Sequence, residues 1–157
     1  MKIALMLTGK TTEKHIATGV ETYSKRISKY SGFEIITLPD LKNTRNMPPE
    51  EQKLKEGRKI IQSIGKDDFV VLLDEKGTQF GTVEFAGWLE KRLFSQNKRI
   101  LFVIGGPWGF SEEVYAVCNM KISLSKMTFS HQLVRLLFVE QLYRAFSVIR
   151  GEPYHHE

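Results

Sequence analysis

Short apolar runs and stretches of helical spacing alternate along this chain. The apolar runs predict short buried strands over 2–7, 33–38, 68–74, 98–104 and, more briefly, 121–124. The stretches between them predict helices over 13–30, 50–63, 82–95, 112–117 and 131–149. Strands that alternate with helices are typical of a mainly parallel sheet with helices on both faces. We therefore expect an α/β fold in a single domain that spans 1–157.

The expected sheet suggests where a ligand would bind. In open α/β sheets, ligands bind beyond the carboxyl ends of the strands. Three segments follow predicted strands at this edge: the loop after Leu73 and Asp74, the turn at 105–111, and the segment SLSKMTFS at 123–130. We expect these three segments to form one site.

The last predicted helix is apolar around more than one face. Its main stripe is Leu133, Val134, Leu137, Phe138, Leu142, Ala145, Phe146 and Ile149. Leu136, Val139 and Tyr143 intrude on the side that carries the polar residues. A helix that is apolar nearly all round is usually buried in a larger core. We favour a subunit interface as the cover for the second face, over the alternative of a central core helix.

The segment before this helix contains more polar chemistry than a helix start needs. One cap suffices, and Ser130 stands where a cap is expected. Helix-capping preferences assign no role to the other hydroxyl groups of 123–130, to Met127 or to His131.

The composition is that of an ordinary soluble protein, with 41% hydrophobic and 26% charged residues among 157. No apolar stretch could span a bilayer, and no basic patch followed by an apolar run marks a secretory signal. One cysteine, Cys118, excludes an internal disulfide and a multi-cysteine zinc site, and we expect it to be a small buried residue. We therefore expect a cytoplasmic protein without a membrane or metal partner.

The formal net charge of +5 permits a polyanionic partner without establishing one. The basic residues are clustered on the first and last helices: Lys25, Arg26 and Lys29, and Arg135, Arg144 and Arg150. A solvated helix face is the plainer interpretation of each cluster.

Two nucleotide-binding motifs are incomplete. Gly9-Lys10-Thr11-Thr12 follows the first strand as in a phosphate-binding loop, but the glycine required five positions earlier is Ala4. The G-x-G-x-x-G dinucleotide fingerprint is also missing. The turn GGPWG at 105–109 has more glycine than a bare turn needs, and glycine lets a ligand approach the backbone closely. A tight turn into a helix capped by Ser111 is the alternative, but the neighbouring loops favour a ligand site.

Four stretches together resemble a known family: LLDEKG at 72–77, FVIGGPWGFS at 102–111, SLSKMTFSHQLVRLLFVEQLYRAF at 123–146, and PYHHE at 153–157. They are similar to the ribosomal RNA large subunit methyltransferase H family, in the SPOUT class of S-adenosylmethionine-dependent methyltransferases. The resemblance covers the whole chain in length and element order, and it is densest after residue 70.

The resemblance implies structural features that the pattern of hydrophobic residues does not predict. It implies a deep trefoil knot formed by roughly 70–157, whose loops hold S-adenosylmethionine, and a homodimer packed through the last helix. The C-terminal tail would reach the partner's active site. Carried over by motif, the cofactor-binding residues are Leu73, Gly105, Gly106, Leu124, Ser125, Lys126, Met127, Thr128, Phe129 and Ser130.

The implied reaction is methyl transfer to N3 of a pseudouridine in large-subunit rRNA, on assembled ribosomes. The implied catalytic residues are His155 as the proton acceptor, Arg144 as the group that stabilises negative charge on the ring carbonyls, and Tyr154. Binding of the rRNA would use a basic surface that includes Lys25, Arg26 and Lys29.

The proton acceptor is open between several groups. His155 is favoured because it follows Tyr154, as in the family pattern PYH. His131 is the second choice, since its place at a helix start disfavours a charged imidazole and suits a structural hydrogen bond. His156, or no histidine at all, is also possible because the chain ends HHE. Two competing functions are a non-catalytic ribosome- or RNA-binding module of the same fold, and an α/β protein that binds another nucleotide.

Overall fold

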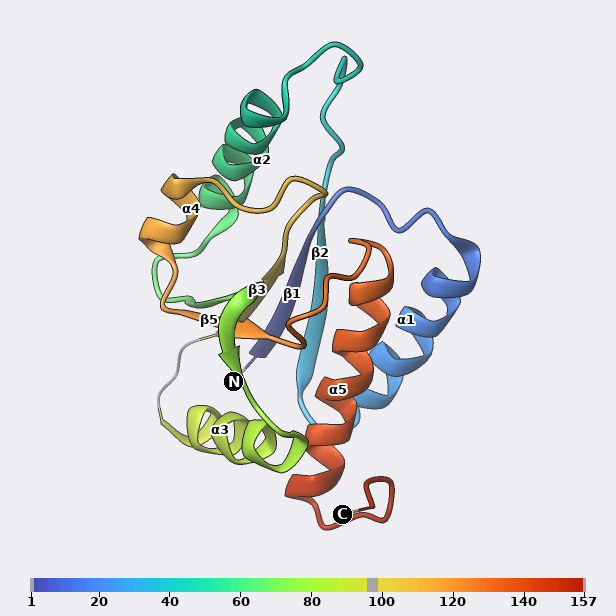
Figure 1. The fold of residues 1–157 in the computed structure, drawn as a ribbon. Coiled ribbons are helices and arrows are strands. Elements are labelled where there is room, and N and C mark those ends of the chain that lie inside the picture. Colours follow the sequence, from blue (N-terminus) through green and yellow to red (C-terminus); the bar gives the residue numbers. More distant parts are fainter. Residues whose placement is uncertain (1, 96–98, 157) are drawn as a thin grey trace.

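Five parallel strands form the centre of the computed structural model, which describes residues 2–95 and 99–156 (Figure 1). The strands are β1 (Lys2–Thr8), β2 (Gly32–Leu38), β3 (Phe69–Gln79), β4 (Ile100–Ile104) and β5 (Met120–Ser123). They lie in the order β2-β1-β4-β3-β5, and every neighbouring pair is parallel. The predicted α/β fold with a mainly parallel sheet is therefore confirmed.

Helices cover both faces of this sheet. They are α1 (Lys14–Ile27), α2 (Pro49–Ser63), α3 (Thr82–Phe94), α4 (Glu112–Val117) and α5 (Leu133–Ile149). Alternate strand residues point to opposite faces. Ile3 and Phe102 therefore pack in a core with α1, α3 and α5, whereas Met6 and Val103 pack in a second core with α2 and α4. The predicted order of elements is correct, and the trefoil knot stays a prediction.

The stretch after Asp74 was predicted to be a loop, and that prediction is wrong. β3 continues to Gln79 and pairs with β5 again after a register shift between Leu73 and Thr78. Gly77 permits this pairing, because a Cβ at this position would lie 2.6 Å from the backbone carbon of Lys121. The expected start of β4 at residue 98 lies outside the described residues. Cys118 is half-buried rather than buried.

Helix α5 occupies the middle of its layer, between α1 and α3 and against the sheet (Figure 1). The predicted stripe needs two corrections. Val139 was assigned to the polar side but is fully buried, whereas Leu133 was assigned to the stripe but is 38% exposed. The central core position accounts for most of the apolar surface that suggested a subunit interface. Within the described residues, no helix is long and apolar enough to cross a membrane.

A buried arginine joins the start of α5 to the carboxyl end of β1. The guanidinium of Arg135 is fully inaccessible to solvent, and it donates hydrogen bonds to the carbonyl oxygens of Thr8 and Gly9 at 3.0 Å. Further bonds reach Thr11 Oγ1 at 2.9 Å and the His131 carbonyl oxygen at 3.1 Å. Burial lowers the pKa of Arg135, so these acceptors have to offset the cost of desolvating its charge.

Gln132 strengthens the same junction. Its Oε1 accepts from the backbone N–H of Thr12 at 2.8 Å, and its Nε2 donates to the Lys10 carbonyl oxygen at 3.1 Å. Two side chains at the entrance to α5 therefore satisfy the carbonyl oxygens of Gly9 and Lys10 and the N–H of Thr12 in the loop between β1 and α1.

We expect the variant Arg135→Met to lose about 3 kcal/mol of unfolding free energy, because the buried carbonyl oxygens of Thr8 and Gly9 would lose their donors. Urea denaturation measures this loss. The matched control is Arg45→Met, at an exposed loop position, for which we expect a change within about 0.5 kcal/mol. Equal stabilities of the two variants would contradict the structural role of Arg135.

Candidate functional site

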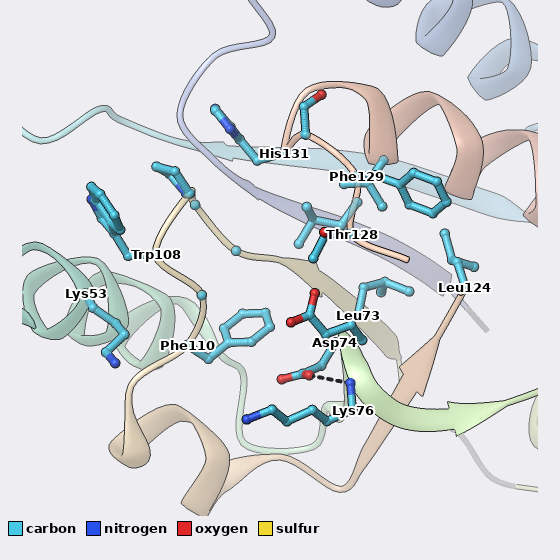
Figure 2. Close-up of a pocket in the computed structure, with 18 of the residues that line it drawn as sticks. Lys53, Leu73, Asp74, Lys76, Trp108, Phe110, Leu124, Thr128, Phe129 and His131 are labelled. Atoms are coloured by element: carbon cyan, nitrogen blue, oxygen red, sulfur yellow. Dashed lines mark hydrogen bonds between the residues drawn. The ribbon is translucent and has the colours of Figure 1, made fainter. Parts of the chain in front are cut away.

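A cavity of about 590 Å³ lies beside the register shift of β3 and at the carboxyl ends of β4 and β5 (Figure 2). Its lining comes mainly from three segments: 73–76 after the buried part of β3, 104–110 after β4, and 124–131 before α5. These are the three segments that the sequence predicted to meet, and the prediction of their proximity is confirmed. Its volume falls within the usual range for small-molecule sites.

The cavity contains most of the predicted cofactor-binding residues. Those in its lining are Leu73, Gly105, Gly106, Leu124, Ser125, Met127, Thr128, Phe129 and Ser130. Lys126 is the predicted residue that does not line it. Several lining residues were not predicted as ligand contacts: Asp74, Lys53, Trp108, Phe110 and Tyr115. Asp74 could have been found, because it directly follows the buried part of a strand at its carboxyl end.

The hydroxyl groups of 123–130 hold the loop in shape. Ser123 Oγ donates to the Ser125 carbonyl oxygen at 2.8 Å, and Ser125 Oγ accepts from the Met127 N–H at 3.0 Å. Ser130 Oγ accepts from the Leu133 N–H at 3.1 Å, although the residue directly before α5 is Gln132, whose side chain makes no cap bond. Three hydroxyls therefore satisfy the backbone of an irregular segment that forms one wall of the cavity.

Asp74 and Tyr115 form a polar pair in the cavity lining. The Tyr115 hydroxyl donates to Asp74 Oδ2. The Lys76 N–H donates to Asp74 Oδ1 at 2.8 Å (Figure 2). Burial, with the Asp74 carboxylate as the next cause, raises the pKa of the Tyr115 hydroxyl. The phenol therefore stays protonated and holds the carboxylate in place at the bulge of β3.

The carboxyl group of Glu56 lies against the backbone of the glycine turn at Gly106. Glu56 Oε2 is buried and has no hydrogen-bond partner among the described residues, while Oε1 accepts from Gln52 at 3.1 Å. A Cβ at Gly106 would lie 2.6 Å from Glu56 Oε2. Burial raises the pKa of Glu56, and the nearby Asp40 adds to this. Glycine at 106 therefore lets the turn lie directly on this side chain.

His131 stands between this cavity and a smaller one of about 190 Å³ that contains Asp40 and Glu56. Burial lowers the pKa of His131, and the Arg135 charge lowers it further. The imidazole is therefore held neutral, which agrees with the direction predicted from its place at the helix start. The main causes are desolvation and the neighbouring guanidinium.

The C-terminal tail turns back onto its own helix. Gly151 has a φ of 68°, the Gly151 N–H donates to the Val148 carbonyl oxygen at 3.1 Å, and the Glu152 N–H donates to the Ser147 carbonyl oxygen at 2.9 Å. This pair of bonds is a Schellman motif, and it requires the left-handed conformation that glycine adopts without strain. The tail therefore leaves α5 in a fixed direction.

The three predicted catalytic residues lie together at this end of α5. Arg144 Nη1 lies 3.2 Å from His155 Nδ1, and the Arg144 guanidinium lies over the Tyr154 ring at 4.7 Å. Glu140, which the sequence analysis missed, accepts from Arg144 at 2.5 and 3.0 Å and from the Tyr154 hydroxyl at 3.0 Å. Its spacing of four residues from Arg144 was a signal for this ion pair. The Tyr23 hydroxyl lies 3.3 Å from the Tyr154 hydroxyl, and no spacing in the sequence indicated this contact.

The cluster of predicted catalytic residues and the cavity lie at opposite ends of α5. Figure 1 shows the tail at the end of α5 that is remote from the loop entering the helix. Arg144 stands about 17 Å along the helix axis from Leu133, at 1.5 Å per residue. None of Arg144, Tyr154 and His155 lines the cavity. One chain therefore does not bring the two predicted halves of the site together.

The predicted RNA-binding residues lie near the tail. Lys25, Arg26 and Lys29 are all exposed at the end of α1. Lys25 pairs with Glu21 at 3.1 Å, and the Arg26 guanidinium lies over the Tyr23 ring at 5.1 Å. In the described part of the chain, no group of three or more acidic, histidine or cysteine side chains could hold a metal ion.

Residues 1–155 match a family model described as "Predicted SPOUT methyltransferase". The chain is 50% identical over 157 residues to a protein of Bacteroides fragilis named "Ribosomal RNA large subunit methyltransferase H", and the match covers 100% of both chains. A protein of the same name from Christiangramia forsetii is 53% identical over 156 residues, which is 99% of each chain.

Two solved structures share the fold. A tRNA (m1G37) methyltransferase from Aquifex aeolicus superposes with a TM-score of 0.57 at 19% identity, over 100% of this chain and 76% of the other. A probable methyltransferase from Bordetella pertussis gives 0.53 at 10% identity, over 91% and 95%. At these identities the likeness concerns the fold alone.

We expect Glu56→Gln to gain stability relative to wild type as the pH rises. Because burial raises the pKa of Glu56 in the folded protein, the folded state binds this proton more tightly than the unfolded chain does. Wild-type stability therefore falls as the pH rises from the ordinary glutamate pKa through the raised one, whereas glutamine does not titrate. Urea denaturation at about pH 4 and about pH 7 measures the difference. A difference that stays constant or shrinks with rising pH would contradict the burial of this charge.

Proposed function

The chain belongs to the ribosomal RNA large subunit methyltransferase H family of SPOUT methyltransferases, and from this we propose that it transfers a methyl group from S-adenosylmethionine to N3 of a pseudouridine in large-subunit rRNA. The substrate is the assembled ribosome, so the protein acts in the cytoplasm. The observation that carries the proposal is the cavity at the carboxyl ends of the strands, which gathers the residues that the family motif assigns to the methyl donor.

The cavity suits the proposed donor in size and in chemistry. Gly105 and Gly106 let the turn that lines the cavity pack closely on Phe110 and Glu56, because a Cβ at either glycine would meet one of these side chains. Leu73, Leu124 and the backbone groups beside them offer an apolar surface with hydrogen-bonding groups for a nucleoside. Bound there, the donor supplies an activated methyl group on a positively charged sulfur. The deep trefoil knot is part of the proposal as the arrangement that wraps these loops around it.

The working site is shared between two subunits of a homodimer. The donor cavity and the cluster of Arg144, Tyr154 and His155 lie at opposite ends of α5, so a second chain has to bring its tail to the first chain's cavity. Leu133, 38% exposed on the outer side of α5, belongs to the face through which the two copies pack.

The chemistry requires the target nitrogen to lose its proton. At neutral pH the N3 atom of a uracil-type ring mostly carries a hydrogen. The lone pair of N3 becomes available only when that proton is lost and the resulting negative charge on the ring is stabilised. Arg144 stabilises that charge at the ring carbonyls, an electrostatic role of the kind that oxyanion sites perform. Burial and the bonds to Tyr23 and Glu140 raise the pKa of Tyr154, so its hydroxyl stays protonated and helps to position Glu140 and Arg144.

Binding of the ribosome uses the exposed cations near the tail. Arg26 lies over the ring of Tyr23, whose hydroxyl contacts that of Tyr154. Lys25 and Lys29 are exposed neighbours of Arg26 in the sequence. Neutralising phosphates releases counterions, so ribosome binding weakens steeply as salt rises.

We expect this protein to incorporate labelled methyl groups from S-adenosylmethionine into ribosomes purified from cells that lack it. Mapping of the modified base should identify a single pseudouridine in large-subunit rRNA. Naked rRNA is the comparison substrate, and we expect it to react poorly. Uptake of S-adenosylmethionine in calorimetry without incorporation would indicate a binding module. Absence of both uptake and incorporation would overturn the proposal.

Pairing two inactive chains tests whether the site is shared. Gly105→Trp should block the donor cavity, because any side chain there meets Phe110, and His155→Ala removes a tail group. A heterodimer of the two, purified through two different tags, contains one intact composite site and one that is doubly damaged. We expect about half the wild-type rate from it, and almost none from either homodimer. An inactive heterodimer would show that both halves act within one chain.

A further inference from the structure

The contact between Arg144 and His155 fixes which ring nitrogen carries the proton. Arg144 Nη1 lies 3.2 Å from His155 Nδ1, and a guanidinium has only donors. Nδ1 must therefore be the acceptor in this bond. In a neutral imidazole the other nitrogen, Nε2, then carries the hydrogen and is a donor.

Glu140 keeps Arg144 in the orientation that this bond needs. Glu140 Oε1 accepts from Arg144 Nε at 3.0 Å and from Nη2 at 2.5 Å, which leaves Nη1 directed at His155. The pair is mostly shielded, with side-chain exposures of 19% for Glu140 and 25% for Arg144. The Tyr154 hydroxyl donates to the same carboxylate oxygen at 3.0 Å and holds it from the other side.

We infer that His155 acts as a hydrogen-bond donor through Nε2 toward a carbonyl oxygen of the target base, and that Glu140 is the positioning residue that fixes this tautomer through Arg144. The inference rests on the proposed methyl transfer and assigns His155 a role other than proton acceptor. A base role would require Nδ1 to take the proton, and this would remove the lone pair that accepts from Arg144.

The step balances without a protein base. The N3 proton leaves to water, and negative charge spreads onto the ring carbonyls, where Arg144 and the Nε2–H of His155 stabilise it. The N3 lone pair then forms the bond to the methyl carbon of S-adenosylmethionine. The electron pair of the broken carbon–sulfur bond stays on sulfur, which becomes a neutral thioether.

The described groups with recorded contacts in the cluster around His155 include residues of two helices and the tail. Glu140 and Arg144 face it from α5, Tyr154 precedes it in the tail, and Tyr23 contacts Tyr154 from α1. Arg26 lies over the Tyr23 ring at 5.1 Å.

Nitrogen NMR of histidine-labelled protein tests the tautomer independently of activity. We expect His155 to show an unprotonated Nδ1 and a protonated Nε2 at neutral pH. Glu140→Gln should shift it toward a mixture of tautomers. The matched control is Glu51→Gln, which removes an i,i+4 ion pair with Lys55 on α2 and should leave the spectrum unchanged. A His155 spectrum with the proton on Nδ1 in the wild type would overturn the inference.

Methylation rates then test the role. Glutamine can place an amide N–H where Nε2–H stands but cannot act as a base. We expect His155→Gln to stay within about tenfold of wild type with a parallel pH profile, and His155→Ala to fall by about 100-fold or more. His155 is the base if two results are found together. His155→Gln would be as slow as His155→Ala, and the methylation rate of the wild type would fall with pH in a titration that neither variant shows. A wild type that methylates no ribosomal substrate refutes the proposed function instead, while the NMR result still stands.

Discussion

The buried guanidinium of Arg135 is the constraint on which the arrangement of this molecule depends. It connects the carboxyl end of β1, the loop that follows it and the first turn of α5 through four hydrogen bonds. The irregular wall of the cavity at 124–131 ends where this junction begins. Desolvating a charge is costly, so the junction is stable only when all its acceptors are in place. Arg135 fixes where α5 begins relative to β1, and the packing of α5 between α1 and α3 sets its course from there.

Local patterns predicted the order of strands and helices, because each element carries its own period. They failed where a distant partner decides the outcome. The extension of β3 beyond Asp74 depends on pairing with β5, and Gly77 makes that approach possible. The position of Val139 depends on α5 lying between two other helices. Neither fact is encoded in a window of neighbouring residues.

The candidate site was predictable to a similar extent. Ligands bind beyond the carboxyl ends of parallel strands, and this rule correctly predicted that three separate segments would meet at one cavity. The ion pair of Glu140 with Arg144 was available from helical spacing. The contact of Tyr23 with Tyr154 joins residues from opposite ends of the chain, and only the folded structure places them together. The distance between the cavity and the tail cluster agrees with the helix predicted over 131–149, which lies between the last cavity segment and the tail.

The Schellman turn at Gly151 has a consequence for how two copies would associate. A flexible tail would lose conformational entropy when it entered another subunit, and that loss would weaken association. Here the turn, the bond of Tyr154 to Glu140 and the bond of Tyr30 to Glu152 already order the tail in the single chain. Association would therefore deliver a preorganised group, and most of the ordering cost would fall on the folding of the chain itself.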